Sequence, residues 1–67
     1  MVVSYNRFIK SLESKGITLN QLRLKGVINQ HTYERMLRNE PVRLEWIASI
    51  CRHLNVSIED VVDIIQD

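Results

Sequence analysis

The chain has little of several features that mark other protein classes. Its single cysteine, Cys51, excludes an internal disulfide and fits a reducing compartment, so we expect a cytoplasmic protein. No apolar run approaches the ~20 residues that a membrane-spanning helix needs, and Met1–Val3 is too short for the core of a signal peptide. We therefore expect a soluble protein with no membrane partner.

The N-terminal half of the chain has few acidic residues and the C-terminal half has few basic ones, although the net charge is only +1. Up to Arg38 there are seven Lys and Arg residues against two Glu, whereas from Asn39 onward there are two Arg against six acidic residues. A polyanion such as DNA would orient a small domain of this kind with its basic side first. Solvated helix faces that happen to segregate by sign would give the same count.

The length of 67 residues allows one domain, which we place over residues 1–67 with an extended arm at residues 1–3. A chain this short buries only about 60% of the surface that its unfolded form exposes. Tight helix packing or a partner subunit is therefore expected to add to its stability.

Helical periodicity dominates the sequence, and no segment alternates with period two for long enough to indicate a strand. We predict an all-α fold, a compact bundle of five short helices. Thr18, Asn29 and Ser57 are good N-caps, and Gly16 and Asn55 suit the left-handed residue after a helix. The predicted helices run over Ser4–Lys15, Thr18–Gly26, Asn29–Arg38 and Arg43–Leu54, with the fifth starting at Ser57.

The predicted core follows from the apolar face of each helix. The fourth helix is apolar over more than half of its circumference, which places it at the centre. The inward-facing residues are expected to be Tyr5, Phe8, Ile9, Leu12, Leu19, Leu22, Tyr33, Met36, Leu37, Leu44, Ile47, Ala48, Ile50, Cys51, Leu54, Ile58, Val61, Val62 and Ile65.

The segment Thr18–Arg38 has the pattern of a helix, a tight turn and a second helix. The outward N-terminal turn of that second helix is rich in side chains that can hydrogen-bond to base edges. Docking such a turn in the major groove is how helix-turn-helix proteins recognise DNA. The side chains are Gln30, His31 and Thr32, with Arg35 one turn later.

Over residues 4–65 the sequence resembles the Cro/C1-type (XRE-like) helix-turn-helix regulators, especially their stand-alone single-domain members. The resemblance is carried by Leu22-Arg23, Ile28-Asn29-Gln30-x-Thr32, Leu44-Glu45-x-Ile47 and Ile50-Cys51-x-x-Leu54-Asn55-Val56-Ser57. It implies a lambda-repressor-like domain whose second and third helices form the helix-turn-helix. The implied function is a bacterial or phage transcriptional regulator, a repressor that binds a pseudo-palindromic operator in double-stranded DNA as a homodimer.

Carried over by position, the resemblance makes Gln30, His31 and Arg35 the expected base contacts, flanked by Thr32. Gln pairs bidentately with adenine and Arg with guanine, which supports these roles. Outside a helix-turn-helix, such residues on a helix surface are usually only solvated. The expected phosphate contacts are Asn29, Arg38, Arg43, Lys25 and Arg23.

Three positions depart from the pattern of that family. Val27 stands where a glycine is usual in the turn, and Arg23 replaces a small residue, which should loosen the packing of the second helix on the third. Leu19 stands where a glutamine often contacts phosphate. These departures keep an alternative open, in which the same fold is an antitoxin, adaptor or anti-repressor without specific DNA binding.

Trp46 lies off the main apolar stripe of its helix, so it either fills the core or anchors a subunit interface. In the second case we expect Ile64 and the arm residue Val3 to join it in a homodimer contact. Cys51, His31 and His53 lie on different predicted helices without paired ligand spacing, so no metal site is expected. The sequence also indicates no catalytic residues, no cofactor and no small-molecule substrate, and an enzyme is not expected.

Overall fold

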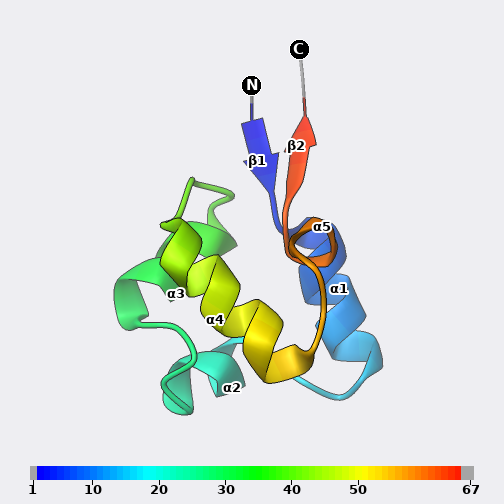
Figure 1. Cartoon of the computed structure of the whole chain (residues 1–67), viewed down its shortest axis with the longest axis vertical. Helices are drawn as coiled ribbons and strands as arrows, with labels where there is room; N and C mark the ends of the chain where they lie inside the picture. Colours follow the sequence, from blue (N-terminus) through cyan, green and yellow to red (C-terminus); the bar gives the residue numbers. More distant parts are fainter. Residues whose placement is uncertain (1, 66–67) are drawn as a thin grey trace.

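The computed structural model describes residues 2–65 and contains five helices, as predicted. In Figure 1, α3 and α4 lie on one side of the molecule, α1 and α5 on the other, and α2 crosses below them. Two short strands extend from the top, next to both chain ends. The elements are β1 (Val2–Ser4), α1 (Asn6–Ser14), α2 (Leu19–Leu24), α3 (Gln30–Leu37), α4 (Leu44–Leu54), α5 (Ile58–Val61) and β2 (Asp63–Ile65).

The predicted helix ends are confirmed at α2, α3 and α4. Thr18 forms a capping box with Gln21, in which each side chain accepts a hydrogen bond from the other residue's backbone N–H at 3.2 Å. Asn29 caps α3 because its Oδ1 accepts a hydrogen bond from the backbone N–H of Thr32 at 2.7 Å. Asn55 ends α4 in the left-handed conformation, with φ of +57°. Local side-chain chemistry therefore sets where α2 and α3 begin and where α4 ends.

The all-α prediction is wrong in one respect, because the two ends of the domain pair as an antiparallel sheet. Val3 lies opposite Ile64, and the predicted arm residues Val2 and Val3 belong to β1, while Met1 lies outside the described residues. The fifth helix is correspondingly shorter than expected and ends at Val61. The β-branched residues of both ends favour an extended backbone once they have a partner strand.

The core is a single cluster that draws on α1 to α5 and on the α2–α3 turn. Its buried apolar residues are Tyr5, Phe8, Leu12, Leu19, Leu22, Val27, Ile28, Met36, Ile47, Ile50 and Val61. Not every predicted core residue belongs to it. The exposed exceptions are Leu37, Leu44, Ala48, Ile58 and Ile65. The helix α4 therefore buries a narrower stripe than its composition suggests, and its first turn leaves apolar surface in contact with solvent.

The α2–α3 connection accommodates the three departures from the family pattern. Leu19 and Val27 are both buried in the core, while Gly26 ends α2 with φ of +78°. Arg23, which stands where a small residue is usual, packs against α3: its guanidinium lies 5.4 Å from the centre of the Tyr33 ring. A cation above an aromatic face attracts it, so this contact links α2 to α3.

Polar contacts hold the α3–α4 connection against the start of α1. The backbone N–H of Tyr5 donates to Asn39 Oδ1 at 2.9 Å, and its buried phenol donates to the carbonyl of Glu40 at 2.8 Å. Burial raises the pKa of this phenol above its ordinary value, and a hydrogen bond with the backbone of Val42 partly offsets that. Hydrogen bonds from Tyr5, the residue that precedes α1, therefore fix the position of the α3–α4 connection.

Candidate nucleic-acid interface

The outer face of α3 presents three of the four side chains that the sequence predicts to contact bases, those of Gln30, His31 and Arg35. Gln30 and His31 are exposed in the first turn, and Gln30 Nε2 donates to Glu34 Oε2 at 3.2 Å, one turn away. Arg35 Nε donates to His31 Nε2 at 2.9 Å. His31 and Arg35 therefore form a paired polar surface on α3.

Arg35 is also held from the other side. Its Nη1 donates to the carbonyl oxygen of Pro41 at 3.3 Å, so the guanidinium is anchored both to α3 and to the α3–α4 connection. An arginine has five N–H donors in a planar fork, so two anchoring bonds leave donors for a further acceptor. This arrangement lowers the entropy that Arg35 would lose on binding a ligand.

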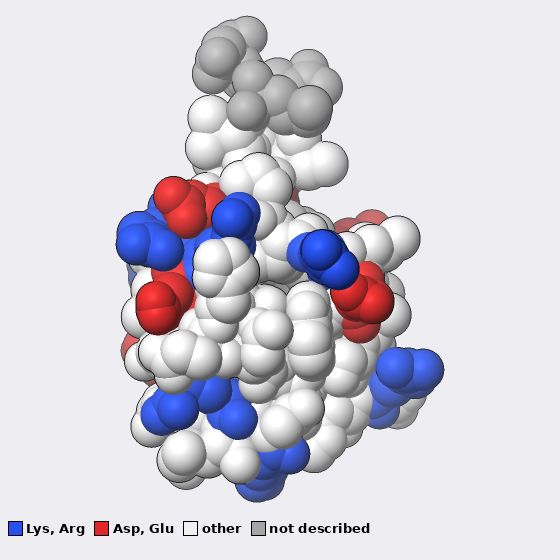
Figure 2. Space-filling view, turned by 90° about the vertical axis from the view of Figure 1, so that its left-hand side faces the viewer, with Lys and Arg blue, Asp and Glu red and all other residues white. Residues whose placement is uncertain are grey.

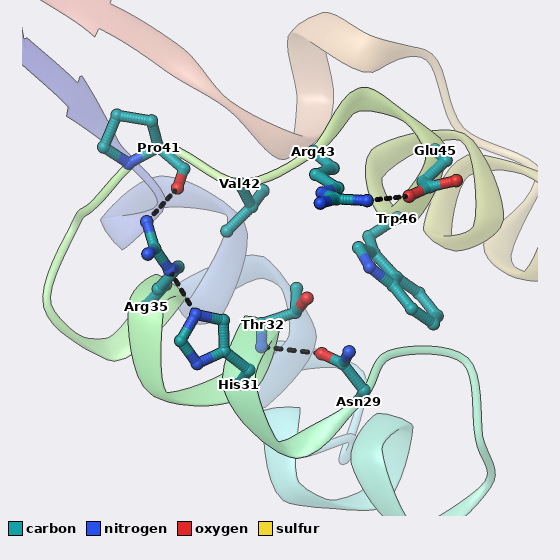
Figure 3. A pocket seen from close by; sticks show the side chains of 9 residues that line it. All are labelled: Asn29, His31, Thr32, Arg35, Pro41, Val42, Arg43, Glu45 and Trp46. Carbon is teal, nitrogen blue, oxygen red and sulfur yellow. Dashed lines mark hydrogen bonds and ion pairs between the residues drawn. The ribbon is translucent and has the colours of Figure 1, made fainter.

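Thr32 differs from its neighbours because only 4% of its surface is exposed. The structure therefore does not bring it to the outer surface with Gln30 and His31. It lies at the base of a hollow between α3 and the first turn of α4 (Figure 3).

This hollow, which we call the α3–α4 groove, has a volume of about 580 Å³. Figure 3 shows Asn29, His31 and Arg35 on the α3 side and Arg43 and Trp46 on the α4 side, across from them. Its lining residues are Asn29, His31, Thr32, Arg35, Pro41, Val42, Arg43, Glu45 and Trp46. Side chains from both helices thus converge on one open site whose lining is polar and apolar in similar measure.

Two of the predicted phosphate contacts are paired with carboxylates on the surface. Arg38 Nε lies 3.4 Å from Glu40 Oε1, and Arg43 Nη1 lies 3.5 Å from Glu45 Oε1. Exposed ion pairs of this kind contribute only about 0–1 kcal/mol, so a phosphate can displace the carboxylate at small cost. Both arginines remain able to contact an external anion.

The other predicted phosphate contacts differ in how they are placed. Lys25 is exposed at the end of α2. The carbonyl of the Asn29 side chain caps α3, but its amide group makes no hydrogen bond within residues 2–65 and can still donate. Arg23 instead donates to Asn20 Oδ1 through Nε and Nη2 and lies over Tyr33, so it mainly stabilises the α2–α3 packing.

Basic side chains gather on the face that carries α3. Residues 18–54 contain six Lys and Arg against three Glu. In Figure 2 the blue side chains along the lower edge of this face stand apart from red ones, whereas those higher up lie beside them. At the opposite side, Arg7 of α1 pairs with Asp63 of β2 at 3.0 Å, and this contact raises the pKa of Arg7. The uncompensated positive charge therefore lies on the side of α2 to α4.

The three residues predicted for a dimer contact are not brought together. Val3 and Ile64 lie opposite each other in the sheet and line a separate apolar hollow of about 180 Å³. Trp46 lies in the α3–α4 groove, next to the predicted DNA contacts. The sequence analysis did not predict that Trp46 lies beside the DNA contacts. The spacing from Arg43 could have indicated it, because residues three apart in the first turn of a helix lie on the same side.

Other kinds of site receive no support from the described residues. Residues 2–65 include no cluster of three or more His, Cys, Asp or Glu side chains suited to a metal ion. Within the same range, each helix is too short or too polar to cross a membrane.

Comparison with known proteins agrees with this geometry. The model of the Cro/C1-type HTH DNA-binding domain family matches residues 7–67. A solved structure of the transcriptional regulator VanUg (Form II) superposes with a TM-score of 0.88 and 27% sequence identity, covering 98% of this chain and 88% of that one. A search of curated proteins gave no match. The chain belongs to the Cro/C1-type HTH DNA-binding domain family.

Proposed function

We propose that this protein is a sequence-specific transcriptional repressor that inserts α3 into the major groove of an operator. The helices α2 and α3 are its helix-turn-helix, as in a lambda-repressor-like domain. The observation that carries the proposal is the hydrogen-bonded pair formed by the exposed His31 and the half-buried Arg35, which with Gln30 project from α3 within a basic face. The family match and the resemblance to a transcriptional regulator support the same assignment.

The base contacts follow from the donors that α3 offers. Arg35 forms a bidentate contact with guanine O6 and N7, and Gln30 pairs with adenine N6 and N7. Each such contact discriminates against a wrong base by about 1–3 kcal/mol. Thr32 is excluded as a direct base contact in this proposal because it is buried.

Phosphate contacts fix the orientation of α3 without reading sequence. Asn29 and the N-terminal backbone amides of α3 donate to one phosphate, where the helix dipole also favours negative charge. Arg38 and Arg43 address others after releasing their carboxylate partners, and Lys25 adds a further positive charge at the end of α2.

The proposed repressor is a homodimer formed through the end of the molecule that carries the sheet. We call this surface the apolar end. It contains the exposed apolar residues Leu44, Ile58 and Ile64 around the hollow that Val3 also lines, while Val2 and Ile65, also exposed, pair with each other on the opposite face of the sheet. A large exposed apolar patch of this kind marks an interaction site, and a second copy would bury it and position two α3 helices about 34 Å apart on one face of the duplex.

DNA binding is tested by selecting bound sequences from a pool of random duplexes at increasing salt. We expect an enriched, inverted-repeat sequence and an affinity that falls steeply with salt, since each phosphate contact releases counterions. Arg35→Ala should relax the preference at one base pair in each half-site. The proposal is refuted if no duplex is bound at low salt. A protein partner that co-purifies and binds Arg35→Ala equally well would favour the alternative of an interaction module.

Dimer formation is tested by sedimentation of two variants that place a lysine at an exposed apolar residue. Ile64→Lys lies in the apolar end, whereas Leu24→Lys lies on α2, and the two side chains are similarly exposed at 61% and 68%. Only Ile64→Lys should shift the protein to monomer. Equal behaviour of the two variants would contradict an interface at the apolar end.

A further inference from the structure

Two hydrogen-bonded pairs of side chains join neighbouring turns of α3. Arg35 Nε donates to His31 Nε2 at 2.9 Å, and Gln30 Nε2 donates to Glu34 Oε2 at 3.2 Å. Residues four apart lie on the same side of a helix, so each pair links a side chain of one turn to a side chain of the next. The proposed base contacts, Gln30 and Arg35, therefore each have a partner one turn away on α3.

The bond to Arg35 uses the nitrogen with which His31 could itself reach a base. Nε2 lies at the outer end of an imidazole ring, whereas Nδ1 lies next to the carbon that joins the ring to the side-chain stem. In Figure 3 the ring of His31 and the guanidinium of Arg35 point toward one another. His31 is therefore better placed to hold Arg35 than to contact a base.

The guanidinium of Arg35 has two edges that can make a bidentate contact, one formed by Nε and Nη2 and one formed by Nη1 and Nη2. The bond to His31 occupies the Nε–H, which closes the first edge. Nη1 donates to the carbonyl oxygen of Pro41 at 3.3 Å, but each terminal nitrogen carries two N–H groups. Within residues 2–65 the second edge thus keeps a free N–H on both nitrogens.

A guanine base offers a matching pair of acceptors. Its O6 and N7 lie side by side on the major-groove edge, which is the pattern that two N–H groups of one arginine recognise. An arginine without internal partners loses side-chain freedom when it makes such a contact. Holding one edge in place before binding reduces this loss and favours acceptors in a fixed position, as on a base edge.

We propose that His31 is a positioning residue for base recognition, which orients Arg35 so that Nη1 and Nη2 donate to guanine O6 and N7. His31 itself contacts no base. This inference rests on the proposed function. It adds to that function the residue that sets the strength of guanine discrimination, and the edge of Arg35 that makes the contact.

A double-mutant cycle on base preference tests this role. Arg35→Ala identifies the base pair that Arg35 reads, and the ratio of affinities for duplexes with guanine and with adenine at that position measures the discrimination. His31→Ala should lower this ratio about threefold to tenfold, because Arg35 then loses more side-chain freedom in the contact that only guanine offers. In the Arg35→Ala background, His31→Ala should change the ratio less than about twofold, since its effect passes through Arg35.

Two further variants provide the matched comparisons. His31→Gln supplies the acceptor Oε1 to Arg35 from the same turn, and it should restore most of the discrimination. Glu34→Ala removes the partner of Gln30 instead, so it should leave the discrimination at the Arg35 base pair unchanged. Because His31 is exposed and alanine favours a helix, His31→Ala should fold as the wild type does, which circular dichroism checks.

The outcomes separate this inference from the proposed function. If His31→Ala leaves guanine discrimination unchanged while the wild type binds duplex, the pair is only a surface contact, so the inference is wrong and the DNA-binding function stands. If the effect of His31→Ala persists in the Arg35→Ala background, or falls at a different base pair, His31 contacts a base and the inference is again wrong. If no duplex is bound at low salt, the proposed function itself fails and the inference fails with it.

Discussion

Asn39 offers a sharp test of how the α3–α4 connection is held. It follows α3 with φ of +56°, a conformation that few residues other than glycine and asparagine adopt readily. Its Oδ1 accepts a hydrogen bond from the partly buried N–H of Tyr5 at 2.9 Å, and its Nδ2 donates to Asn6 Oδ1 at 3.3 Å. The side chain and the backbone of Asn39 therefore both contribute to stability.

Three substitutions separate these two contributions. Asn39→Ala loses the acceptor, which costs about 1–3 kcal/mol for the unpaired Tyr5 N–H, and adds roughly 1–2 kcal/mol of backbone strain. Asn39→Gly also loses the acceptor but tolerates the left-handed conformation. The added glycine raises the conformational entropy of the unfolded chain, which destabilises the fold by about 0.4–1 kcal/mol. Asn39→Asp keeps an acceptor and much of the tolerance, so it should be the least destabilised.

Urea unfolding followed by far-ultraviolet circular dichroism measures the three free energies. We expect Asn39→Ala to lose about 2–5 kcal/mol and to be the least stable, with Asn39→Gly between it and Asn39→Asp. In a domain of this size, 1 kcal/mol corresponds to roughly 4–8 °C in melting temperature. If Asn39→Ala is as stable as the wild type, Asn39 does not hold the α3–α4 connection in place. If Asn39→Ala is more stable than Asn39→Gly, the left-handed backbone of residue 39 does not contribute to the difference.

Three further predictions concern the core and the packing of α2 on α3. Met36→Ala should lower the free energy of unfolding by about 2–5 kcal/mol because Met36 is completely buried. The adjacent Leu37→Ala should lower it by well under ~1 kcal/mol because Leu37 is 53% exposed. Equal losses for the two variants in urea unfolding would contradict this description of the core. The raised pKa of Tyr5 means that its phenol stabilises the fold below the ordinary value of 10.0, and that this contribution is lost as the pH rises from there toward the folded pKa. An alkaline titration of stability should therefore fall more steeply for the wild type than for Tyr5→Phe, and parallel curves would count against it. Arg23→Ala should cost about 0.5–1 kcal/mol through the lost contact with Tyr33, while Lys25→Ala serves as the control and should change stability by less than ~0.5 kcal/mol.

The parts of the fold that depend on local chemistry were predictable from the sequence. Thr18 and Asn29 cap the helices that follow them, and Asn55 takes the left-handed conformation expected after α4. In each case the signal lies within three or four residues of the feature that it sets. The family resemblance, which depends on the order and length of these helices, is confirmed for the same reason.

The sheet depends on contacts that a local pattern does not contain. Each strand has three residues, too few for an alternation of period two to be recognised, and β1 pairs with β2 across some sixty positions of sequence. Val62 and Ile65 fit the apolar stripe of a longer fifth helix equally well. Only the presence of Val2 and Val3 next to them favours the extended form.

The candidate site was predictable in its residues and only partly in its arrangement. The sequence singled out Gln30, His31 and Arg35, of which the first two are exposed on α3 and Arg35 is half-buried beside His31. It did not show that Thr32 is buried or that Trp46 stands across the groove, since both depend on how α4 crosses α3. Helix periodicity identifies a face but does not tell which neighbour covers it.

The central claim is that the exposed face of α3 binds duplex DNA. It is tested most directly by comparing the affinity of Arg35→Glu and Lys10→Glu for a selected operator at fixed salt. The two variants change the net charge equally, and Lys10 is exposed on α1, across the molecule from α3 (Figure 1). We predict a loss of at least about 100-fold for Arg35→Glu and less than about threefold for Lys10→Glu. Equal losses for both would show that the attraction is only general charge and would contradict recognition through α3.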